Sequence, residues 1–176
     1  MNRARRERAM ELLVHATGEA EWNRRRMRCA LGRAGVRADK REGDGATPVG
    51  TFALRRVLYR ADRIPPPETA LAVRPLDAND GWCDEPADPD YNRMVRLPHD
   101  GHCERLWRDD GIYDVLVVLD HNDSPVRPGA GSAIFLHLAR PQFAPTEGCV
   151  ALAAGDLLDV LATCRPGDRL RVIGGD

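Results

Sequence analysis

The sequence predicts a mainly β domain, either a sandwich or an open barrel, with one short helix near its C-terminal end. Many short apolar segments lie between turns rich in Gly, Pro and Asp, which is typical of this class. Only residues 156–164 repeat their apolar side chains at the spacing of an amphipathic helix. Residues 168–173 show the alternating pattern of a half-buried strand.

The composition is that of a folded chain of ordinary domain size. The 176 residues include 43% hydrophobic and 30% charged side chains, unlike a disordered segment. The formal net charge of −1 argues against a nucleic-acid partner held by overall charge. No apolar run approaches the ~18 residues of a membrane-spanning helix, so no membrane span is expected.

We expect residues 1–9 to form a basic lead-in and residues 10–176 to form a single domain. No apolar stretch follows the arginines of the lead-in, so the pattern of a secretory signal is not visible. The five cysteines form no CxxC pair, and their odd number leaves at least one thiol without an intrachain partner. A disulfide framework is therefore a poor interpretation, and a nucleophilic cysteine becomes worth seeking.

The elements of the first half follow from local patterns. Residues 11–16 predict a strand, and the arginine-rich residues 22–28 predict an exposed turn or strand edge. A loop punctuated by glycines leads into a strand at 51–59. Residues 60–110 show little periodicity and predict long loops around one or two short strands, such as 70–73.

The last third has clearer signals. Its predicted strands are 113–120, 132–138 and 148–152, and a loop occupies residues 121–131. In the predicted helix, Asp156 is a candidate N-terminal cap, and Pro166-Gly167 ends the segment.

Two residues of this region suggest chemistry. His137 ends one predicted strand, and Cys149 begins the next after an 11-residue loop, so adjacent strand ends can bring them together. An imidazole can accept the proton of a thiol and later protonate a leaving amine. Gly148 leaves the backbone beside the sulfur uncrowded, and the amides around it are candidate donors to an oxyanion. Taken alone, a cysteine beside a glycine is more often a small buried hydrophobic residue.

Several motifs give this pair a context. The histidine strand and the segment Thr146-Glu147-Gly148-Cys149-Val150 resemble the active-site motif of the L,D-transpeptidase (YkuD-like) catalytic domain, and the resemblance extends from about Cys29 to Ile173. Further similar segments are Gly45 to Phe52, Gly131 to His137, Gly81-Trp82-Cys83-Asp84, Tyr91-Asn92 and Leu106 to Asp110.

The resemblance implies a β-sandwich-like fold and peptide acyl transfer in peptidoglycan, without a metal or an organic cofactor. Cys149 would attack the carbonyl that precedes a D-alanine, and His137 would act as general base and acid. The partner would be a stem peptide or muropeptide; an amine acceptor gives a transpeptidase and water gives an L,D-carboxypeptidase. This chain departs from the family pattern by Ala151 where an Arg is frequent, by Leu138 where a Gly is frequent, and by a short loop between His137 and Cys149.

Four further residues are candidates for oxyanion or substrate binding: Gly148, Thr146, His121 and Thr47. Thr146 either hydrogen-bonds near Cys149 or shapes its turn, and Thr47 either lines the cleft or has a structural turn role. His121 is either a solvated loop residue or a wall of the cleft.

Two other classes remain open. The departures from the pattern favour a peptidoglycan-binding domain that has lost catalysis. His99, His102 and Cys103 suggest a zinc-binding module, but no second pair lies at ligand spacing, and we expect no metal site. The resemblance implies a cell-envelope or periplasmic location, whereas the missing signal pattern leaves a cytoplasmic one open. The oligomeric state is not predicted.

Overall fold

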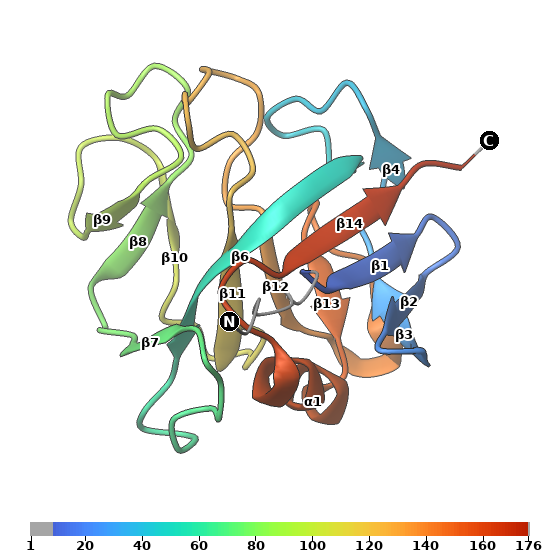
Figure 1. Cartoon of the computed structure of the whole chain (residues 1–176). Helices are drawn as coiled ribbons and strands as arrows, with labels where there is room; N and C mark the ends of the chain where they lie inside the picture. The colour runs from blue at the N-terminus through green and yellow to red at the C-terminus, as the bar shows by residue number, and fades with distance from the viewer. Residues whose placement is uncertain (1–8, 176) are drawn as a thin grey trace, which may run out of the picture.

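The computed structural model describes residues 9–175, which form a strongly curved β-structure with one α-helix near the C-terminal end of the chain (Figure 1). The mainly β prediction is confirmed. The basic lead-in predicted for residues 1–9 lies outside the described part except for its last residue. Among residues 9–175, no helix is long and apolar enough to cross a bilayer.

Nine strands make up the main sheet, in the order β11-β12-β13-β3-β2-β1-β14-β6-β7. Strand β6 pairs with β14 through its first residues and with β11 through the rest, so the sheet closes on itself as a barrel. The strands are β1 (Glu11–His15), β2 (Glu19–Trp22), β3 (Arg25–Ala30), β6 (Gly50–Tyr59), β7 (Ala72–Pro75), β11 (Val115–Leu119), β12 (Phe135–Leu138), β13 (Val150–Leu152) and β14 (Arg169–Ile173).

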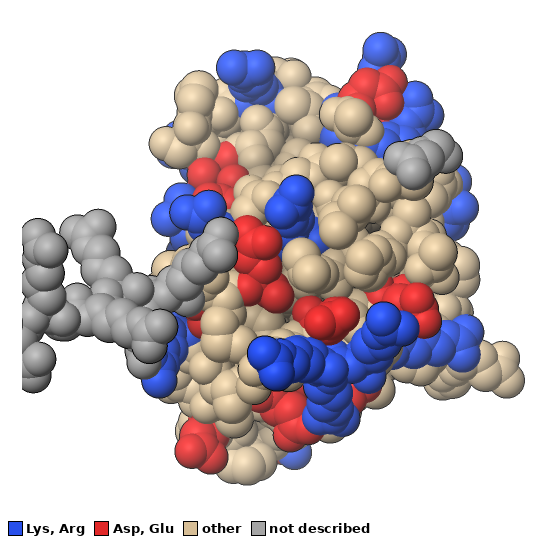
Figure 2. All heavy atoms as spheres, turned by 45° about the vertical axis from the view of Figure 1, so that its right-hand side comes forward, with Lys and Arg blue, Asp and Glu red and all other residues tan. Residues whose placement is uncertain are grey.

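The arginine-rich segment predicted as a turn or strand edge is a hairpin of β2 and β3. Its two-residue turn consists of Asn23 and Arg24, both with positive φ (49° and 66°). Two successive positive φ angles match the right-handed twist of the flanking strands. Figure 2 shows basic and acidic side chains next to each other on one face of the molecule. Arg25 of β3 pairs with Asp156 and Asp159 of the helix.

The prediction for residues 60–110 needs correction, because this region contains more strands than expected. Besides β7, it forms a three-stranded antiparallel sheet of β8 (Asp80–Cys83), β9 (Met94–Arg96) and β10 (Cys103–Arg105). These strands are short and carry charged residues, so hydrophobic periodicity does not reveal them. The buried carboxylate of Asp80 anchors the sheet through ion pairs with Arg74 and Arg96 at 3.1 and 3.3 Å.

The single α-helix within the described residues, α1 (Ala154–Thr163), packs Leu157, Val160 and Leu161 into the main core. It begins two residues earlier than predicted, and Ala153 occupies the N-cap position without a side-chain bond. The predicted cap, Asp156, instead lies in the first turn and pairs with Arg25 at 2.6 Å. A carboxylate in the first turn still interacts favourably with the helix dipole.

Strands β12 and β13 place the two candidate catalytic residues near each other. They run parallel, with Leu136 opposite Val150 and His137 opposite Ala151. A second core cluster, which includes Phe135, Trp82 and Tyr113, packs between this part of the barrel and the small sheet. The strands β4 (Val36–Arg37) and β5 (Thr47–Pro48) pair with each other and hold the ends of the 38–46 loop, which approaches Cys149.

Candidate functional site

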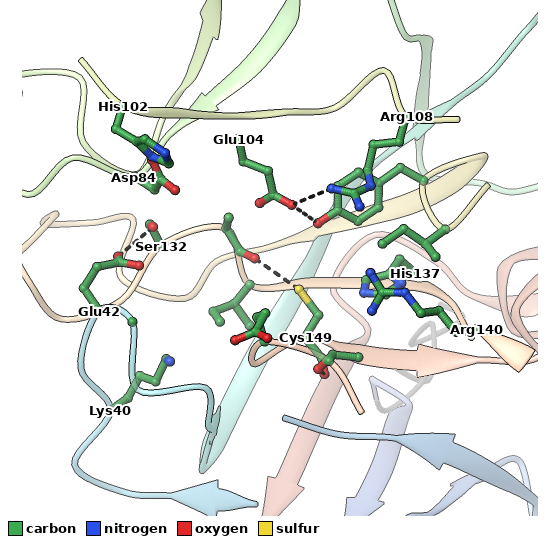
Figure 3. Close-up of a pocket in the computed structure, with 17 residues that line it drawn as sticks. Lys40, Glu42, Asp84, His102, Glu104, Arg108, Ser132, His137, Arg140 and Cys149 are labelled. Atoms are coloured by element: carbon green, nitrogen blue, oxygen red, sulfur yellow. Dashed lines mark hydrogen bonds and ion pairs between the residues drawn. The ribbon is translucent and has the colours of Figure 1, made fainter. Parts of the chain in front are cut away.

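A pocket of about 410 Å³ opens where the ends of β12 and β13 face the small sheet, and both Cys149 and His137 line it (Figure 3). The other lining residues come from the 40–43 loop, the small sheet and its flanks, the segment between β10 and β11, and the segments around β12 and β13: Lys40, Glu42, Gly43, Asp84, His102, Glu104, Arg108, Ile112, Tyr113, Ser132, Ala133, Ile134, Arg140, Thr146 and Glu147.

The thiol of Cys149 is held by backbone groups beside β12. Its Sγ donates to the carbonyl of Ala133 at 3.2 Å and accepts from the amide of Phe135 at 3.3 Å. Burial, together with the charge of Glu104, raises the pKa of Cys149 to about 12. At neutral pH the resting sulfur is therefore a protonated thiol, which needs a base to become a nucleophile.

His137 is arranged as that base. Its Nδ1 donates to the carbonyl of Leu138 at 2.9 Å, since a carbonyl can only accept. Burial lowers the pKa of His137 to about 4, so the ring is neutral at neutral pH. The proton on Nδ1 leaves the lone pair on Nε2 as the basic position. Tyr113 fixes the ring from the side, with its centroid 5.2 Å away in an edge-on contact.

The two side chains share the pocket without a direct bond. Within residues 9–175, Cys149 and His137 form no hydrogen bond with each other, because the thiol points to Ala133 and Nδ1 to Leu138. The structure therefore places both residues in one pocket, and their catalytic roles stay a prediction. A proton transfer between them requires Sγ to leave the carbonyl of Ala133.

The turn that carries Cys149 is fixed from behind by two threonines. Thr146 Oγ1 donates to the Cys149 carbonyl at 2.6 Å and accepts from the Gly148 amide at 3.1 Å. Thr47 Oγ1 accepts from the Gly32 amide at 2.9 Å and contacts the same Cys149 carbonyl at 3.5 Å. Both hydroxyls therefore shape the turn rather than face a substrate.

Gly148 is required by its geometry. Its φ is +140°, and a Cβ at this position would lie 2.8 Å from the carbonyl oxygen of Ala46. Its amide is already bonded to Thr146, so the expectation that it serves as an oxyanion donor is corrected. Thr47, only 1% exposed, does not line the pocket either.

His121 lies outside the pocket, which corrects its proposed role as a wall of the cleft. It lines a separate hollow with Arg55 and Asp123. Its Nε2 donates to the carbonyl of Ala130 at 3.0 Å, and its ring packs edge-on against Phe52. The side chain is a half-buried residue of this loop, and burial lowers its pKa.

Sequence reasoning missed the two arginines that line the pocket near His137. Arg108 binds Asp110 through two bonds, at 3.0 and 2.6 Å, and Arg140 lies 3.7 Å from the same carboxylate. Figure 3 shows Arg108, Arg140 and His137 together on one side of Cys149. We call Arg108 and Arg140 the cationic wall. The segment Leu106 to Asp110 had been noted only for its resemblance, and nothing in its spacing indicates the pocket.

Three acidic residues also line the pocket: Glu42 and Asp84 lie on the side away from the cationic wall, and Glu104 lies 3.9 Å from Nη1 of Arg108 (Figure 3). Glu42 accepts bonds from Tyr91 at 2.5 Å and Ser132 at 2.7 Å, and Asp84 is bonded to His102 at 2.5 Å. Glu104 accepts from the Tyr113 hydroxyl at 2.6 Å, and burial raises its pKa. We call Glu42, Asp84 and Glu104 the acidic wall.

The chain belongs to the L,D-transpeptidase catalytic domain (YkuD) family, because the model of this family matches residues 8–173. This is the family that the sequence motifs around His137 and Cys149 resemble. No curated protein matches the chain.

Solved structures that are similar to this chain include two mycobacterial enzymes. L,D-transpeptidase 1 from Mycobacterium tuberculosis has a TM-score of 0.43 and 14% identity, with 95% of this chain and 62% of that chain covered. An L,D-transpeptidase from Mycobacterium smegmatis has a TM-score of 0.43 and 12% identity, with 93% and 58% covered. This chain thus spans about three fifths of the length of these structures.

Proposed function

We propose that the protein catalyses acyl transfer on peptidoglycan stem peptides, with Cys149 as nucleophile and His137 as general base and acid. The observation that carries the proposal is the tautomer of His137. Its Nδ1 is held by Leu138, so its basic Nε2 is available in the pocket that Cys149 lines. Membership in the family supports the reaction class.

The first step forms a thioester. Nε2 of His137 accepts the proton of Cys149 Sγ as the sulfur attacks the carbonyl carbon of the donor peptide. The C–N bond to D-alanine then breaks, and His137 returns the proton to the departing amine. In the second step an acceptor amine, or water, attacks the thioester carbonyl and loses a proton to His137, and Cys149 is released as the thiol.

The resting charges explain why the pair is quiescent without substrate. A thiol with a pKa near 12 and an imidazole with a pKa near 4 do not exchange a proton spontaneously. Proton transfer becomes favourable only as the S–C bond forms and the negative charge moves to the carbonyl oxygen. Since the Gly148 amide is occupied, we assign the oxyanion contact to the amide of Cys149, the next along the turn.

The pocket walls support a substrate that carries both charges. A stem peptide presents carboxylates and, on its diamino acid, an ammonium group. The cationic wall is placed to bind carboxylate, and the acidic wall to bind ammonium. Ala151 is fully buried between strands, so an arginine at that position could not reach the pocket as the frequent family residue would. Arg108 and Arg140 are placed to take over this role.

The decisive experiment measures D-alanine release from a tetrapeptide that contains a diamino acid, with and without an acceptor amine. Wild type should release D-alanine and form an adduct of thioester mass. Cys149→Ala should do neither, whereas Cys29→Ala, which removes a buried thiol on β3, should retain both. Release by Cys149→Ala would overturn the assignment. The dependence on acceptor separates transferase from carboxypeptidase.

One observation favours a second candidate, a peptidoglycan-binding domain without catalysis: the Cys149 thiol is bonded to Ala133 and not to His137. Such a protein would bind muropeptides equally with or without Cys149 and would never form an adduct. The cell envelope, where such substrates lie, is the location that either proposal implies; fractionation of cells with an antibody tests it.

A further inference from the structure

We propose that the small sheet holds a zinc-class divalent cation, bound by Cys83, Asp88, His99 and Cys103. This site is separate from the reaction proposed above and does not depend on it. None of the four ligands lines the Cys149 pocket.

The first argument is convergence. Ligand atoms of Cys83, His99 and Cys103 all lie within 4.8 Å of one another, and Asp88 Oδ2 lies 3.0 Å from His99 Nε2. Cys83 and Cys103 stand opposite each other on the antiparallel strands β8 and β10. His99 comes from the loop between β9 and β10 and lies with the two sulfurs, and Asp88, from the loop between β8 and β9, joins this group through His99.

The second argument is the backbone that admits the carboxylate. A Cβ on Gly101 would lie 2.4 Å from Asp88 Oδ2, so a side chain here would push the carboxylate away from its present position. Asp88 Oδ1 accepts the Asp90 amide at 2.7 Å, which orients the carboxylate so that Oδ2 faces His99. Cys83 is fully buried, and the side chains of His99 and Asp88 are 19% and 14% exposed.

The third argument is the chemistry of the donor set. Thiolate and imidazole ligands favour zinc over magnesium or calcium, and four protein ligands form a closed structural site. On binding, the two thiols lose their protons to solvent and the sulfurs bind the metal as thiolates. The expected bonds are about 2.3 Å to sulfur and about 2.0–2.2 Å to nitrogen and oxygen.

The structure also revises which histidine takes part. The sequence grouped His99 and His102 with Cys103 and lacked a further ligand at suitable spacing. His102 points to the pocket side, where Asp84 binds it and its side chain is 75% exposed. The missing ligand is Cys83, which the pairing of β8 with β10 supplies.

The position of the site gives it a consequence for the pocket. Asp84 and Glu104 of the acidic wall each follow a cysteine ligand directly in sequence, and neighbouring residues on a strand point to opposite faces. A cation between Cys83 and Cys103 would therefore fix the spacing of these two carboxylates.

The same cysteine pair could instead form a cross-strand disulfide. A disulfide would account for the two sulfurs but not for the convergence of His99 and Asp88 on them, so the observations favour the metal. The two states are distinguished by mass, because a disulfide lacks the two thiol hydrogens, and by reactivity of the thiols in denaturant.

The test uses the full chain, purified under reducing conditions, equilibrated with zinc and freed of excess metal. Elemental analysis should find stoichiometric zinc, and cobalt substitution should give sulfur-to-metal charge-transfer absorption. Cys83→Ser, Cys103→Ser and His99→Ala should each lose at least ten-fold in zinc affinity. The matched controls Cys29→Ser and His102→Ala should bind as wild type does.

His99→Ala keeps the test sound if a cysteine variant fails to fold, because its side chain is the partly exposed one. The proposal is overturned if reduced, folded wild type retains no zinc and gives no cobalt–thiolate absorption. It is equally overturned if the three variants bind zinc as the controls do, or if the purified protein holds a Cys83–Cys103 disulfide that resists mild reduction.

Discussion

The carbonyl of Leu138 fixes the proton of His137 on Nδ1, through a bond of 2.9 Å to the neighbouring residue on the same strand. A histidine usually depends on a distant carboxylate or carbonyl for this. Here the backbone of β12 supplies the partner, so the orientation of the base is set as soon as the strand forms. His137 is only 3% exposed, and this burial keeps the ring neutral and the position of its proton fixed.

The buried neutral imidazole predicts a pH dependence of stability. The pKa of His137 falls from 6.5 to about 4 on folding, so between these values the unfolded chain binds a proton that the native protein does not. The contribution of the neutral His137 ring to the free energy of unfolding is fully present above pH 6.5. It is lost as the pH falls toward 4, by up to about 3 kcal/mol. Urea unfolding at a series of pH values should show wild type losing this much more than His137→Gln. Parallel curves for the two proteins would contradict the argument.

Thr146 should be needed for the shape of the nucleophile turn. Thr146→Val removes the bond to the Cys149 carbonyl and leaves both that carbonyl and the Gly148 amide without this partner. We expect a loss of about 1–3 kcal/mol in the free energy of unfolding, with slower acylation. Thr146→Ser should restore both, because the hydroxyl is what matters. If Val is as active as Ser, the turn does not depend on the hydroxyl.

Gly148→Ala should displace the thiol. The added Cβ would meet the Ala46 carbonyl at 2.8 Å, and a residue with a side chain rarely adopts φ of +140°. We expect the rate of thioester formation to fall at least 100-fold, as measured by intact mass over time. The control is Gly155→Ala in α1, where a Cβ meets nothing within 4 Å. It should leave the rate unchanged and stabilise the helix by about 0.5–1 kcal/mol.

The cationic wall should act on binding more than on chemistry. Arg140→Ala should raise KM for a donor peptide about 10-fold with a smaller change in kcat, since a charged hydrogen bond contributes about 1.5–3 kcal/mol. Arg55→Ala, which removes a guanidinium lining the separate hollow of His121, should leave KM unchanged. Blocking the substrate carboxylates as amides should abolish the difference between Arg140→Ala and wild type. An equal loss with the blocked peptide would exclude a carboxylate contact.

The barrel strands could be predicted from sequence because burial in a core leaves a direct pattern of apolar residues. Residues 115–119, for example, are buried throughout, as their run of branched side chains indicates. The small sheet could not be predicted, since β8 is held by residues far along the chain: Trp82 packs against Phe135, and Asp80 pairs with Arg74 and Arg96. Local sequence carries no record of such long-range pairing.

The same distinction applies to the site. Cys149 and His137 were found because their residue types and spacing suit one reaction, although their shared pocket depends on the parallel pairing of β12 and β13. The cationic wall was not found, because Arg108 and Arg140 reach the pocket from segments that nothing in the sequence connects. Thr47 and Thr146 were identified as neighbours of the nucleophile, but only their hydrogen bonds show that both lie behind it.

Strand β14 connects the N-terminal strands of the barrel to β6. It pairs with β1 on one side and with β6 on the other. β1 lies far earlier in the chain: Met10 and Asp168, which precede the two strands and are hydrogen-bonded to each other, are 158 residues apart. On a ribosome, β1 and β6 emerge early and wait with unpaired edges until residues 169–173 leave the exit tunnel. The barrel therefore closes only after nearly all of the described chain has been synthesised, and loss of these five residues would expose two strand edges at once. The order of synthesis thus makes β14 the strand on which completion of the β1 and β6 edges depends.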